Sequence, residues 1–171
     1  VVESTYNWYW LVDGLMEAGF KVHLANPAAM QQYSGLKHTD DKSDAHWLAH
    51  VLRLGLLPEG YICPKKERSV RDLLRKRSQL VRQKTANVLS IINLFTRNTG
   101  KAINLRQVKK LTAEELRNQF GDESLCLAVA SNLEVFRCLE AQVKLLEQAI
   151  LGKVKLRKEF IQLKTVNGIG D

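Results

Sequence analysis

Three carboxylates are the side chains of this sequence whose types and spacing best fit catalysis. Glu3 follows an apolar pair that reads as the end of a strand, and Asp41 and Asp44 stand three residues apart at the start of a predicted helix. Residues at positions i and i+3 share a helix face, so both aspartates could face one point. Metal-dependent phosphoryl transfer needs several carboxylates around Mg²⁺, because hard cations prefer oxygen ligands. On spacing alone, the stronger alternative is that these aspartates, with Asp40, are only N-cap and first-turn charges.

Basic residues gather in one part of the chain. Residues 65–110 hold 14 Lys and Arg against two acidic residues, so this stretch carries +12 in a chain of net charge +8, which leaves −4 elsewhere. Such local charge favours a polyanionic partner. Four of the arginines fall on one face of a predicted helix and could contact successive phosphates, although a solvated helix face is the alternative. The predicted nucleic-acid-binding side chains are Arg68, Arg71, Arg75, Arg77, Arg82 and Lys84.

Glycines near the end of the chain, two histidines and the tryptophans form smaller patterns. Gly168 and Gly170 could present backbone N–H groups to a phosphate, or form an ordinary turn. His46 and His50 could chelate zinc, but Arg53 shares their face and no acidic ligand does, so a solvated or phosphate-facing stripe is favoured. The tryptophans are expected in the core rather than as base-stacking platforms: Trp8, Trp10 and Trp47.

The elements that must position the carboxylates belong to an α/β segment over residues 1–63, because short apolar runs alternate there with helical patterns. The expected elements are a strand that ends at Val2, a helix over 6–18 closed by Gly19, a strand over 21–25, and a helix that begins at Asp40 or Asp41 and ends before Gly55. A linker rich in proline and glycine follows, and it ends near Pro64.

From Ser69 onward the pattern predicts long helices without strands. A first helix of about 28 residues should end near Gly100, and a second should run from about Glu123 to Leu151. Between them, Thr112 could cap a short helix over 113–120. The apolar positions of the second long helix alternate in steps of three and four, which is typical of a coiled-coil seam and implies an antiparallel pair or a dimer. We name this set the seam: Phe136, Leu139, Val143, Leu146 and Ile150.

Composition excludes several classes of protein. An apolar content of 45% is typical of a chain that folds, and no apolar run approaches the roughly 20 residues needed to cross a bilayer. Three scattered cysteines suggest neither a disulfide framework nor a zinc site, so the reducing cytoplasm is the expected location. The chain opens without methionine and stops within a turn. We therefore expect an internal piece of a longer protein.

Four blocks occur together in the order of one known family. They are VVEST at 1–5, GFKVHLANPAAM at 19–30, KHTDDKSDAHWLA at 37–49 and VRDLLRKRSQLVRQKTANVLSIINLF at 70–95. The sequence resembles the DEDD-type transposases of bacterial insertion sequences, relatives of the pilin-gene invertases that are also described as bridge-RNA-guided recombinases. The D-x-x-D-A block and the arginine-rich helix that follows it carry the resemblance most specifically.

The resemblance implies a partial RuvC-like domain of RNase H fold over 1–63, a basic helical or coiled-coil region over 64–162, and the start of a helix-hairpin-helix-like domain over 163–171. Glu3 matches the family's glutamate, and Asp41 and Asp44 match its D-x-x-D pair. The first aspartate has no counterpart here. The nucleophilic serine matches none of the chain's serines and would lie beyond Asp171.

Such a protein would cut and rejoin DNA at insertion-sequence ends and target sites in the bacterial cytoplasm, in association with the nucleoid. It would use Mg²⁺ and a structured noncoding bridge RNA. This chain alone would bind nucleic acid and form a homo-oligomer through its long helices without catalysis. Two alternatives remain open: a non-enzymatic helical nucleic-acid-binding and dimerisation module, and a RuvC-like nuclease that uses metals alone.

Overall fold

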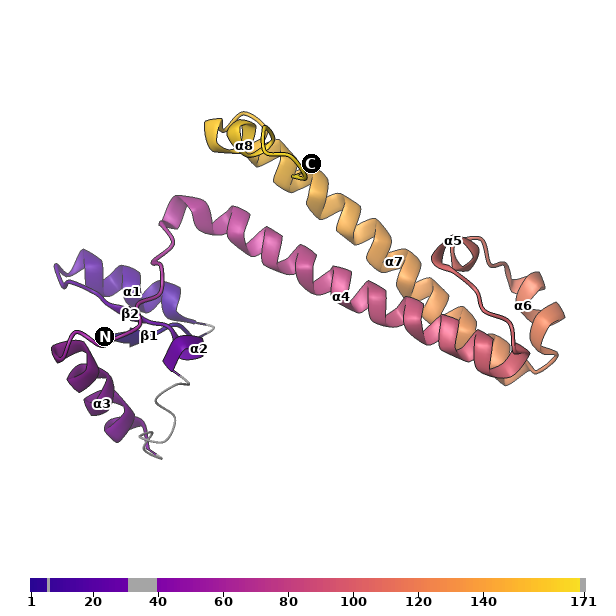
Figure 1. The fold of residues 1–171 in the computed structure, drawn as a ribbon, viewed down its shortest axis with the longest axis horizontal. Coiled ribbons are helices and arrows are strands. Elements are labelled where there is room, and N and C mark those ends of the chain that lie inside the picture. The colour runs from indigo at the N-terminus through magenta and orange to yellow at the C-terminus, as the bar shows by residue number, and fades with distance from the viewer. Residues whose placement is uncertain (6, 31–39, 170–171) are drawn as a thin grey trace. The chain divides into compact units, whose positions relative to one another are not determined.

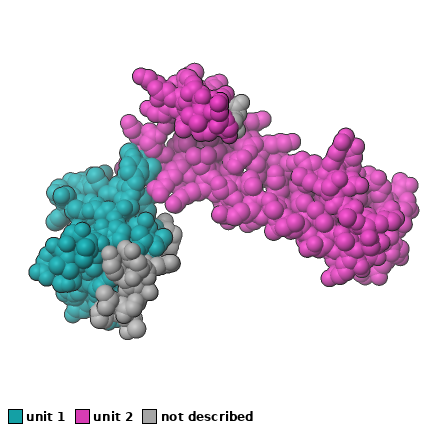
Figure 2. Space-filling view, viewed as in Figure 1, with its two compact units in different colours: residues 1–64 teal, residues 65–171 magenta. Residues whose placement is uncertain are grey.

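A computed structural model describes residues 1–5, 7–30 and 40–169. The chain forms two compact units, Val1–Pro64 (unit 1) and Lys65–Asp171 (unit 2), which are coloured teal and magenta in Figure 2. Unit 1 mixes strands and helices, and unit 2 is helical throughout its described part (Figure 1). In the described residues, no helix combines the length and apolar content that a bilayer-spanning segment requires.

Unit 1 is built on a β-α-β crossover. Strand β1 (Val2–Glu3) pairs in parallel with β2 (Leu24–Ala25), and helix α1 (Trp8–Glu17) connects them. The bend at Gly19 has φ +85°, a left-handed conformation that glycine adopts without strain, so the predicted helix end is confirmed. The helix itself begins at Trp8, and Tyr6, where it was expected to begin, lies outside the described residues.

The strands are shorter than the sequence predicts. Of the strand expected over 21–25, only the last two residues are assigned to β2, although the backbone N–H of Val2 also donates to the carbonyl of His23 at 2.9 Å. On the other edge of β2, Ala25 forms an antiparallel bridge with Glu59. The described sheet has two strands, so the α/β class is confirmed as a small parallel unit, and the RNase H architecture stays a prediction.

A small apolar core holds unit 1 together. Trp8 and Val12 of α1 pack with Leu24 of β2, and all three are buried. Helix α2 (Pro27–Met30) follows β2, and helix α3 (Asp41–Arg53) has Val51 as its one buried residue. Because α3 buries little apolar surface, its placement depends on few contacts.

Unit 2 is a hairpin of two long helices. Helix α4 (Lys65–Thr99) has 35 residues and α7 (Glu123–Val154) has 32, and α7 runs back along α4 (Figure 1). The first long helix is longer than expected because it begins directly after Pro64, in a charged stretch where no apolar periodicity marks a helix. The seam of α7 is turned inward, with Phe136, Val143 and Ile150 buried.

The hairpin has a closed end and an open end. At the closed end, the apolar core includes Ile91 and Phe95 of α4, Leu116 of α6 and Phe136 of α7. Two short helices cover it there, α5 (Leu105–Val108) and α6 (Ala113–Phe120). At the open end, helix α8 (Lys158–Leu163) follows α7 beside the first turns of α4. The predicted bounds of α6 are confirmed.

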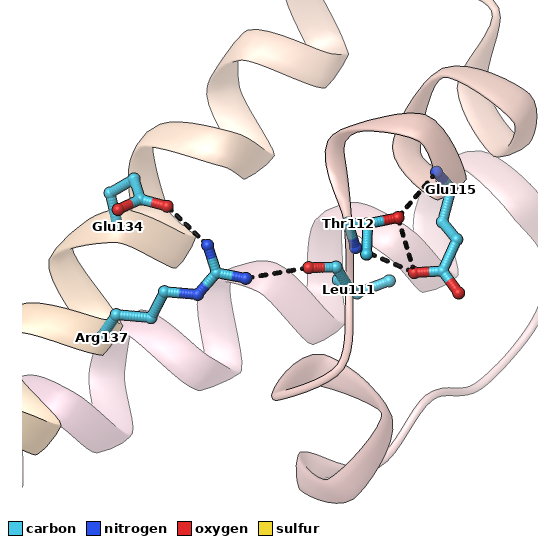
Figure 3. Close-up of polar contacts among 5 residues, drawn as sticks. All are labelled: Leu111, Thr112, Glu115, Glu134 and Arg137. Carbon is cyan, nitrogen blue, oxygen red and sulfur yellow. Dashed lines mark hydrogen bonds and ion pairs between the residues drawn. The ribbon is translucent and has the colours of Figure 1, made fainter.

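Polar contacts fix the turn that leads into α6 (Figure 3). Thr112 and Glu115 form a capping box, in which the Thr112 hydroxyl accepts from the Glu115 backbone N–H at 3.2 Å and the Glu115 carboxylate accepts from the Thr112 N–H at 2.8 Å. The guanidinium of Arg137 donates to the carbonyl of Leu111 at 3.0 Å and pairs with Glu134. Helix α7 therefore holds this turn directly.

Candidate catalytic carboxylates and nucleic-acid interface

Asp40 is the N-cap of α3. Its carboxylate accepts from the backbone N–H of Ser43 at 2.9 Å and from the hydroxyl of Ser43 at 2.7 Å. Asp41 and Asp44 lie in the first helical turn, which follows this cap. The sequence left all three aspartates equal as capping groups, and the structure gives the capping hydrogen bonds to Asp40.

Asp44 has an unusual environment among these carboxylates. Its Oδ1 atom is buried and accepts no hydrogen bond in the described residues, although Asp41 in the same turn is exposed. A buried carboxylate oxygen without a donor loses its hydration without compensation. A cation ligated by this oxygen would supply that compensation, so the atom fits a metal ligand.

Glu3 does not complete the cluster that the sequence predicts. It is the last residue of β1, at the carboxyl end of the parallel pair, and its side chain is exposed. Within residues 1–5, 7–30 and 40–169, no group of three or more His, Cys, Asp and Glu side chains is placed to hold a metal ion. Glu3, Asp41 and Asp44 do not form such a group in the structure, and their convergence on a shared cation stays a prediction.

The histidines and tryptophans of unit 1 differ from one another in placement. His50 of α3 lies 3.2 Å from the guanidinium of Arg53, in agreement with the expectation that these residues share a face. Trp8 is buried, but Trp10 is 69% exposed. The prediction that Trp10 belongs to the core is wrong. Trp10 follows Trp8 by two residues, so its side chain points about 200° around the helix axis from that of Trp8.

The basic residues of α4 divide between two faces. Arg77 forms an ion pair with Glu147 of α7 at 2.6 Å, so it lies on the α7 side. Arg75 and Arg82 are exposed, and Arg71 is half-buried with a buried Nη1 atom that has no hydrogen-bond partner in the described residues. We name Arg71, Arg75 and Arg82 the outer arginines, because helical geometry turns them away from the positions that α7 covers.

Two other predicted contacts with nucleic acid are placed differently from the outer arginines. Arg68 is only 8% exposed. The prediction that it belongs to an open ridge of arginines is therefore wrong, because helical periodicity does not indicate this burial. Lys84 is half-buried.

The pKa of the Glu140 carboxyl on α7 is lowered by a hydrogen bond from Lys109, with smaller contributions from the charges of Lys144 and Lys84.

Acidic residues of α7 pair with part of the basic charge, which the local charge count did not indicate. Glu140 and Glu147 stand seven residues apart, beside the seam, and each pairs with a cation from another element. A signal was present, because flanking positions of a helical seam commonly carry charges that pair across it. The unpaired positive charge of this region is therefore smaller than its count of basic residues predicts.

The glycine turn near residue 168 is described only in part. Gly168 has φ +90° and is exposed, and the following Ile169 N–H donates to the carbonyl of Val166 at 3.1 Å. Gly170 lies outside the described residues. Phosphate binding by this turn stays a prediction.

Comparison with known proteins decides the family. Residues 1–98 match the model of the DEDD_Tnp_IS110 family, which is described as a transposase. The chain belongs to this transposase family. The match spans unit 1 and almost all of α4, so it includes the candidate carboxylates and the outer arginines. No curated protein and no solved structure matches the chain. Membership identifies a DNA-processing enzyme whose partner is DNA and whose chemistry depends on divalent metal ions.

Proposed function

We propose that this chain is a nucleic-acid-binding part of an RNA-guided transposase, in a protein that cuts and rejoins DNA at insertion-sequence ends and targets. The observation that carries the proposal is the face of the outer arginines. None of Arg71, Arg75 and Arg82 takes part in an ion pair within the described residues. Three cations one to two helical turns apart fit successive phosphates, which position a nucleic acid without reading its sequence.

The carboxylates are the proposed Mg²⁺ ligands. Asp44 offers an oxygen that lacks a donor, Asp41 lies in the same helical turn, and Glu3 is the third member of the motif. Mg²⁺ is commonly held by one or two carboxylates together with water. The two aspartates could therefore bind the ion before Glu3 reaches it. When bound, Mg²⁺ would stabilise charge at the scissile phosphate. Glu3 would have to approach the pair when nucleic acid binds.

The proposed partners are a structured bridge RNA, DNA and a second copy of this chain. A structured bridge RNA and DNA are both polyanions, and the outer arginines suit either one. A homo-oligomer through the long helices is supported by apolar side chains that α4 leaves exposed on α7: Leu127, Val135 and Leu145.

By the family resemblance, the nucleophilic serine is not among this chain's residues. We therefore expect this chain alone to bind nucleic acid and not to cleave it.

A salt titration of binding tests the proposal. The triple variant Arg71→Ala, Arg75→Ala, Arg82→Ala should weaken binding to duplex DNA of any sequence and should reduce the slope of log affinity against log salt by up to about 0.9 per lost contact. The control triple removes the same charge from exposed positions near the closed end: Lys101→Ala, Arg106→Ala and Lys110→Ala. Equal slopes for the arginine triple and the parental chain would show that this face is only solvated surface.

A second measurement addresses the metal. Binding of Mn²⁺, followed by electron paramagnetic resonance in the presence of duplex DNA, should be lost in Asp41→Asn, Asp44→Asn. Asp40→Asn is the matched control, because Asn retains N-cap function. Equal Mn²⁺ binding by the parental chain and the double variant would favour the non-enzymatic module.

A further inference from the structure

The open end of the hairpin contains a groove that the transposase assignment leaves unexplained. Helices α4, α7 and α8 enclose a cavity of about 580 Å³. Its apolar lining includes Leu74 of α4, Ile150 and Leu151 of α7, and Phe160 of α8. A volume of this size is typical of sites that hold a small organic group such as a nucleobase.

Phe160 separates this groove from a second hollow of about 440 Å³. Leu151 and Phe160 line both, and Lys155, Ile161 and Lys164 complete the second. The ammonium of Lys164 lies 5.9 Å from the centroid of the Phe160 ring. The two hollows therefore form one continuous surface with an aromatic ring at its centre.

The charge around this surface is strongly one-sided. Four cations line it, namely Arg77, Lys144, Lys155 and Lys164, and the only acidic side chain among its lining residues is Glu147. Glu147 is already paired with Arg77 at 2.6 Å. An apolar floor with an aromatic ring, bordered by cations, is the arrangement that binds single-stranded nucleic acid, because bases stack and phosphates pair.

A further contact gives the groove a fixed wall. Arg157, directly before α8, forms an ion pair with Glu67 in the first turn of α4. The contact joins residues 90 positions apart in the chain, so it holds the start of α8 against α4. Phe160 lies within the first turn that follows, three residues after Arg157.

We propose that this groove binds a single-stranded segment of nucleic acid, with a base against Phe160 and the neighbouring phosphates on Lys144 and Lys155. The proposal rests on the proposed nucleic-acid function but assigns a site separate from the outer arginines. Duplex DNA keeps its bases stacked inside the helix, so the groove selects unpaired nucleotides such as those of an RNA loop or an opened DNA strand.

The test compares a fluorescein-labelled ten-nucleotide oligothymidylate with a duplex of the same length, by fluorescence anisotropy on the full chain. Phe160→Ala should weaken binding of the single strand by about fivefold to a hundredfold and should leave duplex affinity within about twofold. Phe160→Tyr, which retains the ring, should bind as the parental chain does. Leu105→Ala is the control for removal of an exposed apolar side chain elsewhere, and thermal unfolding checks that each variant folds.

Charge removal gives an independent measure. Lys144→Ala should flatten the salt dependence of single-strand binding by about 0.7 for each lost contact, whereas Lys110→Ala should have a smaller effect. Unchanged single-strand affinity in Phe160→Ala, or equal losses for both nucleic acids, would overturn the proposal. Binding of an acidic amphipathic peptide in the groove, without binding of the oligonucleotide, would also overturn the proposal. Duplex binding in the outer-arginine triple reports separately on the proposed function.

Discussion

The two ends of the hairpin in unit 2 are made of the same two helices but differ in what covers them. At the closed end, α5 and α6 lie over the helix pair, and Ile91, Leu116 and Phe136 are almost completely removed from water. At the open end only the six residues of α8 follow, and Leu74 and Leu151 remain 46% and 42% exposed. The seam continues through both ends, so the difference comes from the covering elements.

This difference separates stability from binding along one pair of helices. Burial of apolar area is the main source of folding free energy, so the closed end should account for most of the stability of unit 2. The open end retains exposed apolar side chains, which contribute less to folding and remain accessible to a ligand. The comparison leads to three predictions.

The largest effect is expected from the core of the closed end. Phe136→Ala should reduce the free energy of unfolding by about 3–5 kcal/mol, because truncation of a fully buried ring leaves a cavity. Leu74→Ala at the open end should cost less than about 1 kcal/mol, because its side chain is already half exposed. Urea unfolding followed by circular dichroism measures both values. Similar losses for the two variants would remove the distinction between the ends.

A smaller effect is expected at the cover of the closed end. Thr112→Ala removes the hydroxyl that accepts from the Glu115 N–H and should cost about 1 kcal/mol. Thr112→Ser retains the hydroxyl and serves as the matched control. Hydrogen exchange should show faster exchange over α6 in the alanine variant, and unchanged protection there would mean that the Arg137 contact alone holds the turn.

The smallest effect concerns the ion pair between Glu140 and Lys109, which join at 2.5 Å. The pKa of Glu140 lies below its ordinary value of 4.5 in the folded protein, mainly because of the Lys109 hydrogen bond. The ionised carboxylate therefore stabilises the fold above pH 4.5, and this contribution is lost as the pH falls through the lower folded pKa. Glu140→Gln should destabilise the protein at neutral pH by less than about 1 kcal/mol.

A double-mutant cycle with Lys109→Met isolates that interaction from other effects of the substitutions. The coupling should be present at pH 7 and absent near pH 3. A coupling that does not change over this range would attribute the contact to packing of the lysine stem and not to charge.

Most of unit 2 could be predicted from the sequence because its structure is local. Helical periodicity gave the seam, and the Thr112 and Glu115 pair gave the bounds of α6. The start of α4 was missed because Lys65 to Ser69 lack apolar residues. The burial of Arg68 was missed as well, because periodicity ranks an arginine as a surface residue whatever packs against it.

The candidate site was harder to predict because it depends on contacts between distant segments. Spacing placed Asp41 and Asp44 on one turn, which the structure confirms, and left the choice of N-cap open. Neither spacing nor resemblance could give the position of Glu3 relative to α3, since strand pairing and the path of the connecting chain determine it. The apolar groove also draws its lining from helices far apart in the sequence, so no local pattern indicated it.

The length of α4 sets a distance scale for whatever binds this hairpin. At a rise of about 1.5 Å per residue, its 35 residues span about 52 Å. One strand of duplex DNA advances about 3.4 Å per nucleotide, so the closed and open ends lie as far apart as about 15 base pairs of straight DNA. A nucleic acid shorter than this can contact the groove or the closed end, but not both at once. The length of an oligonucleotide therefore determines which parts of the hairpin it can contact.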